Sequence, residues 1–338
     1  MSKTKTTSAV TVLGAGAWGT ALAIHLARNG YPVTLWAHHA EQIASMSEAR
    51  CNTRYLPGIE FPASLNLQAD LRAAVELASI ILIVVPSQAF RETLRAIKPL
   101  LKTNQRLAWG TKGMERGSNK LLHQLVAEEL GTDIPCACLS GPTFAAEVGK
   151  GLPGAITVAS RNQVYAKEVA EILHNPHFRA YTSEDIIGVE LGGALKNVLA
   201  IAAGIADGLG FGANTRAALI TRGLHELMRL GKTLGGRAET FMGLAGLGDL
   251  ILTCTDNQSR NRRFGLALGR GENMDKAIKD IGQVVEGVHS AAEAYALAQA
   301  HNIEMPIAEQ VYKVLYENED PHDAVRDLLD REVKPEVA

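Results

Sequence analysis

Cysteines are few in this 338-residue sequence, and they show no pairing pattern. The four of them form no C-x-x-C motif, and no histidine stands near them at metal-ligand spacing. This is typical of a reduced, intracellular protein with neither a disulfide framework nor a zinc site. We therefore expect no bound metal, and thiols that serve as packing residues. The cysteines are Cys51, Cys136, Cys138 and Cys254.

An excess of either charge is also lacking. The chain has 34 lysines and arginines against 36 aspartates and glutamates, a formal net charge of -2. This balance argues against a protein built around binding to nucleic acid or another polyanion. Hydrophobic residues make up 46% and charged residues 21%, as in an ordinary folded protein. At this length two domains are the usual arrangement.

Long apolar runs free of charge are missing too. The run IILIVV, residues 80–85, is too short to span a bilayer. The N-terminus resembles a secretory signal where Lys3 and Lys5 precede apolar residues, but the glycines of residues 14–19 interrupt that run. A longer apolar stretch, residues 185–210, carries Asp185, Glu190, Lys196 and Asp207. We expect a cytoplasmic protein without membrane insertion.

What the sequence does contain, up to about Ser183, is an alternation of strand and helix patterns. A helix is predicted over residues 20–30 and another after Pro86. Strands alternating with helices predict an α/β fold with a mainly parallel sheet covered on both faces. The predicted strands lie within residues 9–14, 32–38, 78–86, 106–113, 136–142, 154–160 and 178–183.

Only helix patterns follow, the first of them over residues 185–206. We therefore predict an α/β domain over residues 1–187 and an all-helical domain over residues 188–338. Glycine-dense helices with apolar stripes also suggest a homodimer. The later predicted helices lie within residues 215–235, 274–281, 289–302 and 306–318.

The stretch GAGAWG, residues 14–19, fits the pattern G-x-G-x-x-G between a predicted strand and a predicted helix. In a Rossmann-type doubly wound sheet Gly14 permits the tight turn, Gly16 lets a pyrophosphate approach the backbone, and Gly19 lets the helix pack on the sheet. Free N–H groups at the helix N-terminus, around Ala17 and Trp18, then face the phosphates. The motif predicts a dinucleotide site, and the alternative is a plain glycine-rich turn.

The end of the second predicted strand bears on the choice of dinucleotide. NAD-specific sites usually carry Asp or Glu there, but this chain has Trp36, Ala37, His38 and His39, with no carboxylate before Glu41. Without that charge a 2′-phosphate is admissible, and His38 is a candidate to face it. We expect use of NADP, or of both nucleotides. The alternative is that His38 is an ordinary surface residue.

Two lysines stand where a ligand is expected. Lys112 follows the strand pattern of residues 106–110, and polar residues 140–143 follow the next strand, at the carboxyl ends where ligands bind. Lys196 lies within a helix that is apolar on nearly every face, so it needs an anion partner. Burial and a nearby cation bring a lysine pKa toward roughly 7 to 8, suited to a general base. The alternatives are solvated or ion-paired structural lysines.

Asp249 follows the glycine-rich segment GLAGLG in an apolar setting, so Lys196 is its natural partner; otherwise it caps a helix. Nearby, the stretch TCTDNQSRNRRFG, residues 253–265, is dense in hydrogen-bonding groups. Arg260, Ser259 and Asn261 suit the oxygens of a phosphate. We expect Arg262 and Arg263 to continue a helix whose apolar face is Phe264, Leu266 and Leu268.

Taken together, several segments resemble the bacterial NAD(P)-dependent glycerol-3-phosphate dehydrogenases, from about residue 10 to about residue 316. These segments are GAGAWGTALA, GTKG, LSGPTFAAEV, VELGGALKNVLAIAAG, GLAGLGDLILTCTDNQSRNRRFG and QVVEGV. The resemblance implies reversible conversion of sn-glycerol 3-phosphate to dihydroxyacetone phosphate, which supplies glycerol 3-phosphate for phospholipids. It also implies that Lys196 is the proton acceptor.

From the chemistry of this reaction we expect Lys112 to polarise the substrate oxygen, Asp249 to orient the Lys196 ammonium, and Arg260 to hold the phosphate. The resemblance also assigns the contact residues. Substrate contacts fall on Lys112, Gly141, Thr143, Lys196, Asp249, Ser259, Arg260 and Asn261. Besides Gly14, Gly16, Ala17 and Gly19 of the motif, cofactor contacts fall on Trp18, His38, Lys112, Ala145, Arg260, Val284 and Glu286. Two alternatives stay open: a related dehydrogenase of a 3-hydroxy acid or a phosphogluconate, and an NADPH sensor without turnover.

Overall fold

The computed structural model describes residues 8–332 and 335–336, so Lys3 and Lys5, on which the signal-like pattern rests, lie outside the described residues. The chain divides into two compact units, Met1–Glu190 and Leu191–Ala338. The division between residues 187 and 188 remains our proposal for the domain boundary.

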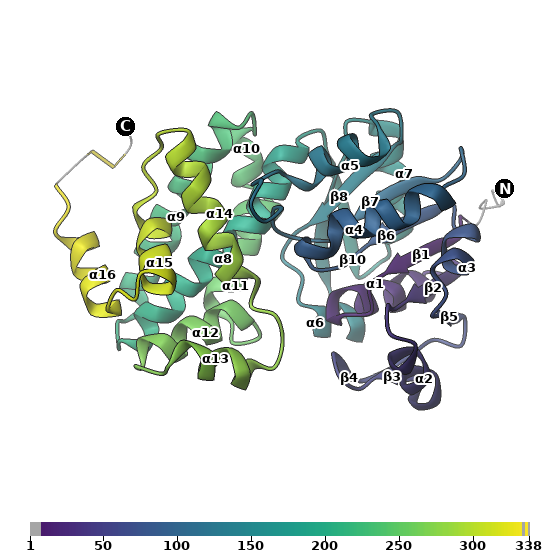
Figure 1. Cartoon of the computed structure of the whole chain (residues 1–338), viewed down its shortest axis with the longest axis horizontal. Coiled ribbons are helices and arrows are strands. Elements are labelled where there is room, and N and C mark those ends of the chain that lie inside the picture. The colour runs from purple at the N-terminus through teal and green to yellow at the C-terminus, as the bar shows by residue number, and fades with distance from the viewer. Residues whose placement is uncertain (1–7, 333–334, 337–338) are drawn as a thin grey trace. The chain divides into compact units, whose positions relative to one another are not determined.

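The first unit is built on one eight-stranded sheet with the strand order β10-β9-β8-β7-β6-β1-β2-β5 (Figure 1). Every neighbouring pair is parallel except β8 and β9, which run antiparallel. From β5 to β8 the order is that of the dinucleotide-binding doubly wound fold, 3-2-1-4-5-6. The strands are β1 (Val10–Leu13), β2 (Val33–Trp36), β5 (Leu65–Gln68), β6 (Ile80–Ile83), β7 (Arg106–Trp109), β8 (Cys136–Ser140), β9 (Gly154–Ala159) and β10 (Phe178–Ser183).

Apolar side chains on both faces explain why these segments form a covered sheet. All four residues of β1 and all four of β6 are buried, as in a sheet with helices on each side. Val10 and Val12 belong to a core cluster with residues of α1 (Ala17–Arg28) and α7 (Gln163–Leu173). On the other face the Phe90 ring, from α4 (Ser87–Ile97), meets Trp109 of β7 edge-on. The predicted α/β fold is therefore confirmed.

Several short elements do not follow from the sequence patterns. The main one is a two-stranded antiparallel hairpin of β3 (Cys51–Asn52) and β4 (Leu56–Glu60). Its second strand contains Pro57 and Gly58, residues that are depleted in strands, so no strand pattern marks it. The remaining helices are α2 (Ala40–Ala49), α3 (Leu71–Glu76), η1 (Lys98–Leu100), α5 (Leu122–Leu130) and α6 (Ala145–Lys150).

The second unit is helical throughout its described residues, as predicted (Figure 1). Its first helix, α8, begins at the end of the first unit and runs for 23 residues. A π-helical turn, η2, leads directly into α11. The elements are α8 (Ile186–Gly208), α9 (Ala213–Thr233), α10 (Ala238–Phe241), η2 (Leu244–Gly248), α11 (Asp249–Thr255), α12 (Arg260–Gly269), α13 (Met274–Ile281), α14 (Glu286–Ala300), α15 (Pro306–Tyr316) and α16 (Pro321–Leu329).

Helix α8 is long and apolar enough to cross a membrane by length and composition, but 89% of its apolar window is buried inside the protein. Of the four charged residues that counted against a membrane span, Asp185, Glu190 and Lys196 are buried and Asp207 is partly buried. All four are hydrogen-bonded. Asp185 accepts from the backbone N–H of Gly188, and Glu190 accepts from the Trp109 indole. Lys196 donates to Asp249, and Asp207 accepts from Arg262.

Helices α8 and α12 pack with their backbones in close contact. An added Cβ at Gly204 would lie 2.2 Å from the carbonyl oxygen of Arg262, and one at Gly265 would lie 2.1 Å from that of Ile201. Gly208 and Gly269 make equally close approaches one turn further along each helix. Glycine at these positions therefore lets the two helices approach closely enough to bring Asn197 of α8 against Asn261 of α12.

We expect Gly265→Ala to destabilise the second unit by about 3 kcal/mol or more, because overpacking against an immobile backbone lies at the upper end of the usual cost. Denaturant unfolding measures the change. Gly212→Ala is the control, since an added Cβ there meets nothing within 4 Å. Equal, small effects at both positions would contradict the close packing.

Glu226 of α9 predicts a pH dependence of stability. Burial raises the pKa of this carboxyl to about 7, against the lowering effect of hydrogen bonds from the N–H groups of Ile307 and Ala308. Between about pH 4.5 and pH 7 the folded protein keeps a proton that the unfolded chain loses. The free energy of unfolding should therefore fall by roughly 3 kcal/mol as pH rises through this window.

Glu226→Gln should remove this decrease, because the amide does not titrate. Denaturant unfolding from about pH 5 to about pH 8 tests it, with Glu309→Gln as the control at a partly exposed carboxyl. An unchanged pH slope in Glu226→Gln would show that Glu226 is charged in the folded protein across this range.

Candidate functional site

The glycine-rich turn after β1 has the geometry that its sequence predicts. Gly14 has φ +119°, and an added Cβ would lie 2.3 Å from the carbonyl oxygen of Val84. A Cβ on Gly19 would lie 1.9 Å from the carbonyl oxygen of Gly14, so α1 packs directly on the turn. Gly16, in contrast, has open space around it. Such a cradle suits a pyrophosphate at the N-terminus of α1, beside Ala17 and Trp18.

Two amide side chains hold this turn in place. Gln42 of α2 and Asn52 of β3 each donate a hydrogen bond of 2.9 Å to the carbonyl oxygen of Ala15. Asn52 is 1% exposed and also contacts the hydroxyl of Thr20 in α1, at 2.8 Å. With its carbonyl bound on this side, the Ala15–Gly16 peptide has a fixed orientation. Sequence reasoning missed Asn52 because the short hairpin that carries it has no recognisable pattern.

The end of β2 is open to solvent at His38 and His39, whose rings meet edge-on. Trp36, just before them, is instead a core residue that donates from its indole to the carbonyl oxygen of Ala69. The first carboxylate after β2 is that of Glu41, in α2. An exposed imidazole without a neighbouring strand-end carboxylate fits a 2′-phosphate, and the role of His38 stays a prediction.

The loops after β6 and β7 lie beside the glycine-rich turn. The Thr111 hydroxyl donates to the carbonyl oxygen of Val85 at 2.8 Å, and the next residue is the half-buried Lys112. The indole nitrogen of Trp18 lies 2.9 Å from where a Cβ on Gly110 would stand. That nitrogen is buried and has no hydrogen-bond partner in the described structure. The structure thus brings the turn and the Lys112 loop to one edge of the sheet.

The loop after β8 carries the other sequence-predicted residues of this unit. Gly141 is buried against the backbone of β9, where an added Cβ would lie 3.1 Å from the carbonyl oxygen of Ala155. The Thr143 hydroxyl donates to the carbonyl oxygen of Gly141 at 3.2 Å, and Ala145 begins α6. Ser140, at the end of β8, has a buried hydroxyl oxygen without a partner in the described structure.

In the second unit Lys196 and Asp249 form a buried ion pair, as the sequence suggested. The Lys196 ammonium donates to Asp249, and the two residues are 7% and 1% exposed. Asp249 is placed by the π-helical turn η2, which reaches α8 because Gly192 leaves room for the backbone of Ala245. The hydroxyl of Thr253 donates to the Asp249 carbonyl oxygen at 2.6 Å.

The polar residues around the start of α12 have different roles. Arg262 is an anchor, since it is buried and donates to Asp207, to Asn257 and to the carbonyl oxygen of Cys254. Ser259 caps α12 by accepting from the N–H of Arg262. Arg260 is half-buried and donates to Gln283 at 3.3 Å. Arg260 is the first residue of α12, and a helix N-terminus favours anions.

Asn261 joins three segments of this unit. Its amide nitrogen donates to the side-chain oxygen of Asn197 at 2.9 Å, and its oxygen accepts from the N–H of Gly287 at 2.9 Å. This second bond holds the start of α14, with Glu286 and the exposed Val284, beside α12.

Asn197 is a residue that sequence reasoning missed. Its amide nitrogen is buried and has no partner in the described structure, so it is available to a ligand. The signal that marks it is an amide next to Lys196 in an otherwise apolar helix.

Together these side chains offer a buried ammonium with a carboxylate partner, a guanidinium at a helix N-terminus, and buried amides. This set suits proton transfer on a small anionic substrate. Within the described residues no group of three or more histidines, cysteines or acidic residues is arranged to hold a metal ion.

Both halves of the chain match family models of known proteins. Residues 9–166 match the family model "NAD-dependent glycerol-3-phosphate dehydrogenase N-terminus", and residues 185–326 match the corresponding C-terminus. The chain is 58% identical to the glycerol-3-phosphate dehydrogenase [NAD(P)+] of Pseudoalteromonas translucida, over 98% of this chain and 99% of the relative. It is 59% identical to that of Thioalkalivibrio sulfidiphilus, over 97% and 98%.

A solved structure gives the same result. The crystal structure of glycerol-3-phosphate dehydrogenase from Coxiella burnetii is 52% identical and matches with a TM-score of 0.93, covering 96% of this chain and 99% of that one.

The open space at Gly16 yields a test of the nucleotide site. Gly16→Ala should leave the free energy of unfolding almost unchanged, because φ is -75° and nothing lies within 4 Å of the added Cβ. The same methyl group should weaken binding of NADPH by about 10- to 100-fold, the equivalent of ~1–3 kcal/mol of steric cost. Fluorescence titration and thermal unfolding measure the two effects. Unchanged NADPH affinity would place the pyrophosphate elsewhere.

Proposed function

The chain belongs to the NAD-dependent glycerol-3-phosphate dehydrogenase family, and we propose on this basis that it is an NAD(P)-dependent oxidoreductase interconverting sn-glycerol 3-phosphate and dihydroxyacetone phosphate. The observation that carries the proposal is the buried Lys196–Asp249 pair, within the half of the chain that matches the family's C-terminal model. A buried ammonium with one carboxylate partner suits proton exchange with a secondary alcohol.

Oxidation of the alcohol removes a hydride from the carbinol carbon and a proton from its hydroxyl group. A bound nicotinamide nucleotide supplies the acceptor for the hydride, or its donor in the reverse direction. Lys196 takes the hydroxyl proton as the free amine, and as the ammonium it returns a proton to the carbonyl oxygen during reduction. Asp249 holds the lysine nitrogen in place through its hydrogen bond and stabilises the ammonium.

The substrate's phosphate and reacting oxygen need separate partners. Arg260 binds the phosphate, with Ser259 and Asn261 beside it at the start of α12. Lys112 stabilises the negative charge that develops on the substrate oxygen. Binding energy from the phosphate, remote from the reacting carbon, then orients the substrate. Gly141 and Thr143 complete the proposed set of substrate residues.

The nucleotide residues follow from the glycine-rich turn. Gly16 offers the open approach for the pyrophosphate, and His38 is exposed at the strand end that faces the ribose. The absence of a strand-end carboxylate supports acceptance of NADPH besides NADH. The further proposed contacts are Gly14, Ala17, Trp18, Gly19, Lys112, Ala145, Arg260, Val284 and Glu286.

We further propose that the enzyme acts in the cytoplasm as a homodimer, without membrane insertion, and supplies glycerol 3-phosphate for phospholipid synthesis. The burial of α8 within the protein supports a helix that belongs to the core.

Lys196→Ala should reduce turnover of dihydroxyacetone phosphate by on the order of 10²–10⁴, the usual contribution of a general acid or base. Oxidation of NADPH and NADH is followed in parallel assays. Since alanine leaves Asp249 buried without its partner, Lys196→Gln accompanies it as a variant that keeps a hydrogen-bond donor. Lys276→Ala, at an exposed lysine, is the control. A wild-type protein that binds NADPH without turning over the triose phosphate would refute the proposed reaction.

A further inference from the structure

The loop that carries Lys112, residues 110–120, has no regular secondary structure of its own over most of its length. Three of its residues have positive φ: Gly113 at +111°, Gly117 at +84° and Asn119 at 55°. Such a backbone needs tertiary contacts to keep one conformation. On the N-terminal side of Lys112 the anchor is Thr111, hydrogen-bonded to Val85.

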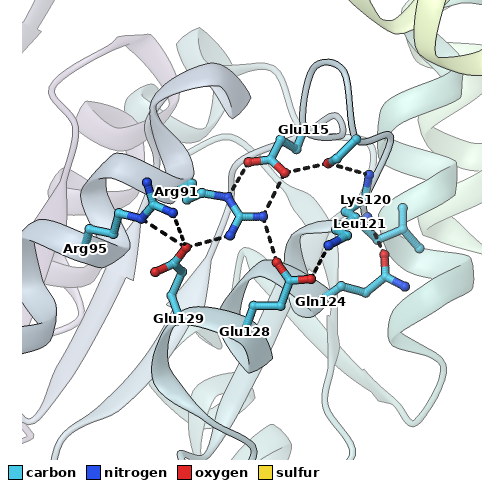
Figure 2. Close-up of polar contacts among 9 residues, drawn as sticks. Arg91, Arg95, Glu115, Lys120, Leu121, Gln124, Glu128 and Glu129 are labelled. Atoms are coloured by element: carbon cyan, nitrogen blue, oxygen red, sulfur yellow. Dashed lines mark hydrogen bonds and ion pairs between the residues drawn. The ribbon is translucent and has the colours of Figure 1, made fainter.

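The anchor on the other side is Glu115, which binds Arg91 of α4 (Figure 2). The guanidinium contacts this carboxylate through two bonds, from Nε at 2.5 Å and from Nη2 at 2.8 Å. It also binds Glu129 at 2.6 Å and Glu128 at 2.8 Å, both on α5. One side chain thus joins helix α4, the Lys112 loop and helix α5.

The other two cations in Figure 2 have narrower roles. Arg95 binds Glu129, and its side chain is 62% exposed, whereas that of Arg91 is 19% exposed. Lys120 binds Glu128. Among the described hydrogen bonds, Arg91 is the cation that binds Glu115, and the uncharged Ser118 hydroxyl also donates to this carboxylate at 2.5 Å.

The bidentate pair keeps its charges over the working range of an enzyme. Hydrogen bonding to Arg91 lowers the pKa of Glu115 to about 2, and the three carboxylates raise the pKa of Arg91. A planar guanidinium matches a carboxylate in a way that a lysine ammonium does not. The pair therefore fixes both the distance and the angle of the loop relative to α4.

Helix α4 also touches the loop beside Lys112. The Ser87 hydroxyl, in the first turn of α4, lies 3.1 Å from where a Cβ on Gly113 would stand, and Met114 is fully buried. The loop thus contacts α4 at both Gly113 and Glu115. Arg91 lies one turn of helix after Ser87 and makes the charged part of this contact.

We propose that Arg91 is a positioning residue for Lys112. It holds the Lys112 ammonium where the reaction needs it, without touching the substrate itself. The inference rests on the proposed function for what Lys112 does, but the structural constraint is independent of it. A displacement of about 1 Å in a reacting group costs on the order of 10²-fold in rate.

A double-mutant cycle tests the proposal. Arg91→Ala should lower kcat/KM for dihydroxyacetone phosphate by about 10- to 100-fold, and Lys112→Ala should lower it on its own. If Arg91 acts through Lys112, then adding Arg91→Ala to Lys112→Ala should change kcat/KM by less than about threefold. Arg91→Lys should recover only part of the loss, and Arg95→Ala should behave like the wild type. Independent, multiplying losses would overturn the proposal.

Hydrogen exchange provides a readout that does not depend on turnover. Backbone amides of residues 113–119 should exchange faster in Arg91→Ala and in Glu115→Gln than in Arg95→Ala. If Arg91→Ala fails to fold, Glu115→Gln provides the test of the proposal. Faster exchange in these variants would support the constraint of Arg91 on the loop, whether or not the wild type reduces dihydroxyacetone phosphate. A wild type without that activity would count against the proposed reaction and not against this constraint. Unchanged exchange in this loop would overturn the proposal whatever the activity.

Discussion

The second unit is organised by the cost of burying a charge. An ammonium at position 196, 7% exposed in an apolar helix, is stable there only with an anion and hydrogen bonds around it. Asp249 meets this requirement, and much local structure follows from bringing it there. The π-helical turn η2 precedes it, and glycines at 192 and 246 let the backbone of that turn pack tightly. A buried ammonium held by one carboxylate is also suited to transferring a proton.

Polar side chains restrain the loops through hydrogen bonds, as apolar packing restrains the helices. Asn52 and Gln42 fix one carbonyl group in the glycine-rich turn. Arg262 fixes the segment before α12 through Asp207 and two further acceptors. In each case a buried or half-buried side-chain donor restrains a backbone segment that has no helix or sheet hydrogen bonds of its own.

The sequence allowed the fold to be predicted where the signal is local. The buried strands β1 and β6, the glycine-rich turn and the apolar helix α8 each show in a short window of residues. The antiparallel pairing of β8 with β9 does not follow from the local sequence, because strand direction depends on the path of the chain between them. Likewise, Lys196 stands out in the sequence of its own helix. The roles of Asn197, Asn52 and Arg91, in contrast, depend on partners that only folding brings near.

Helix α8 has a consequence for how the chain behaves before it is folded. Its 23 residues, with a mean hydropathy of 1.6 over the most apolar window, lie in contact with water in a newly made or unfolded chain. Apolar segments of this kind drive aggregation when they are exposed. The helices packed around α8 therefore shield it from water. A chain that cannot pack these helices around α8 will accumulate as insoluble protein rather than as soluble unfolded protein.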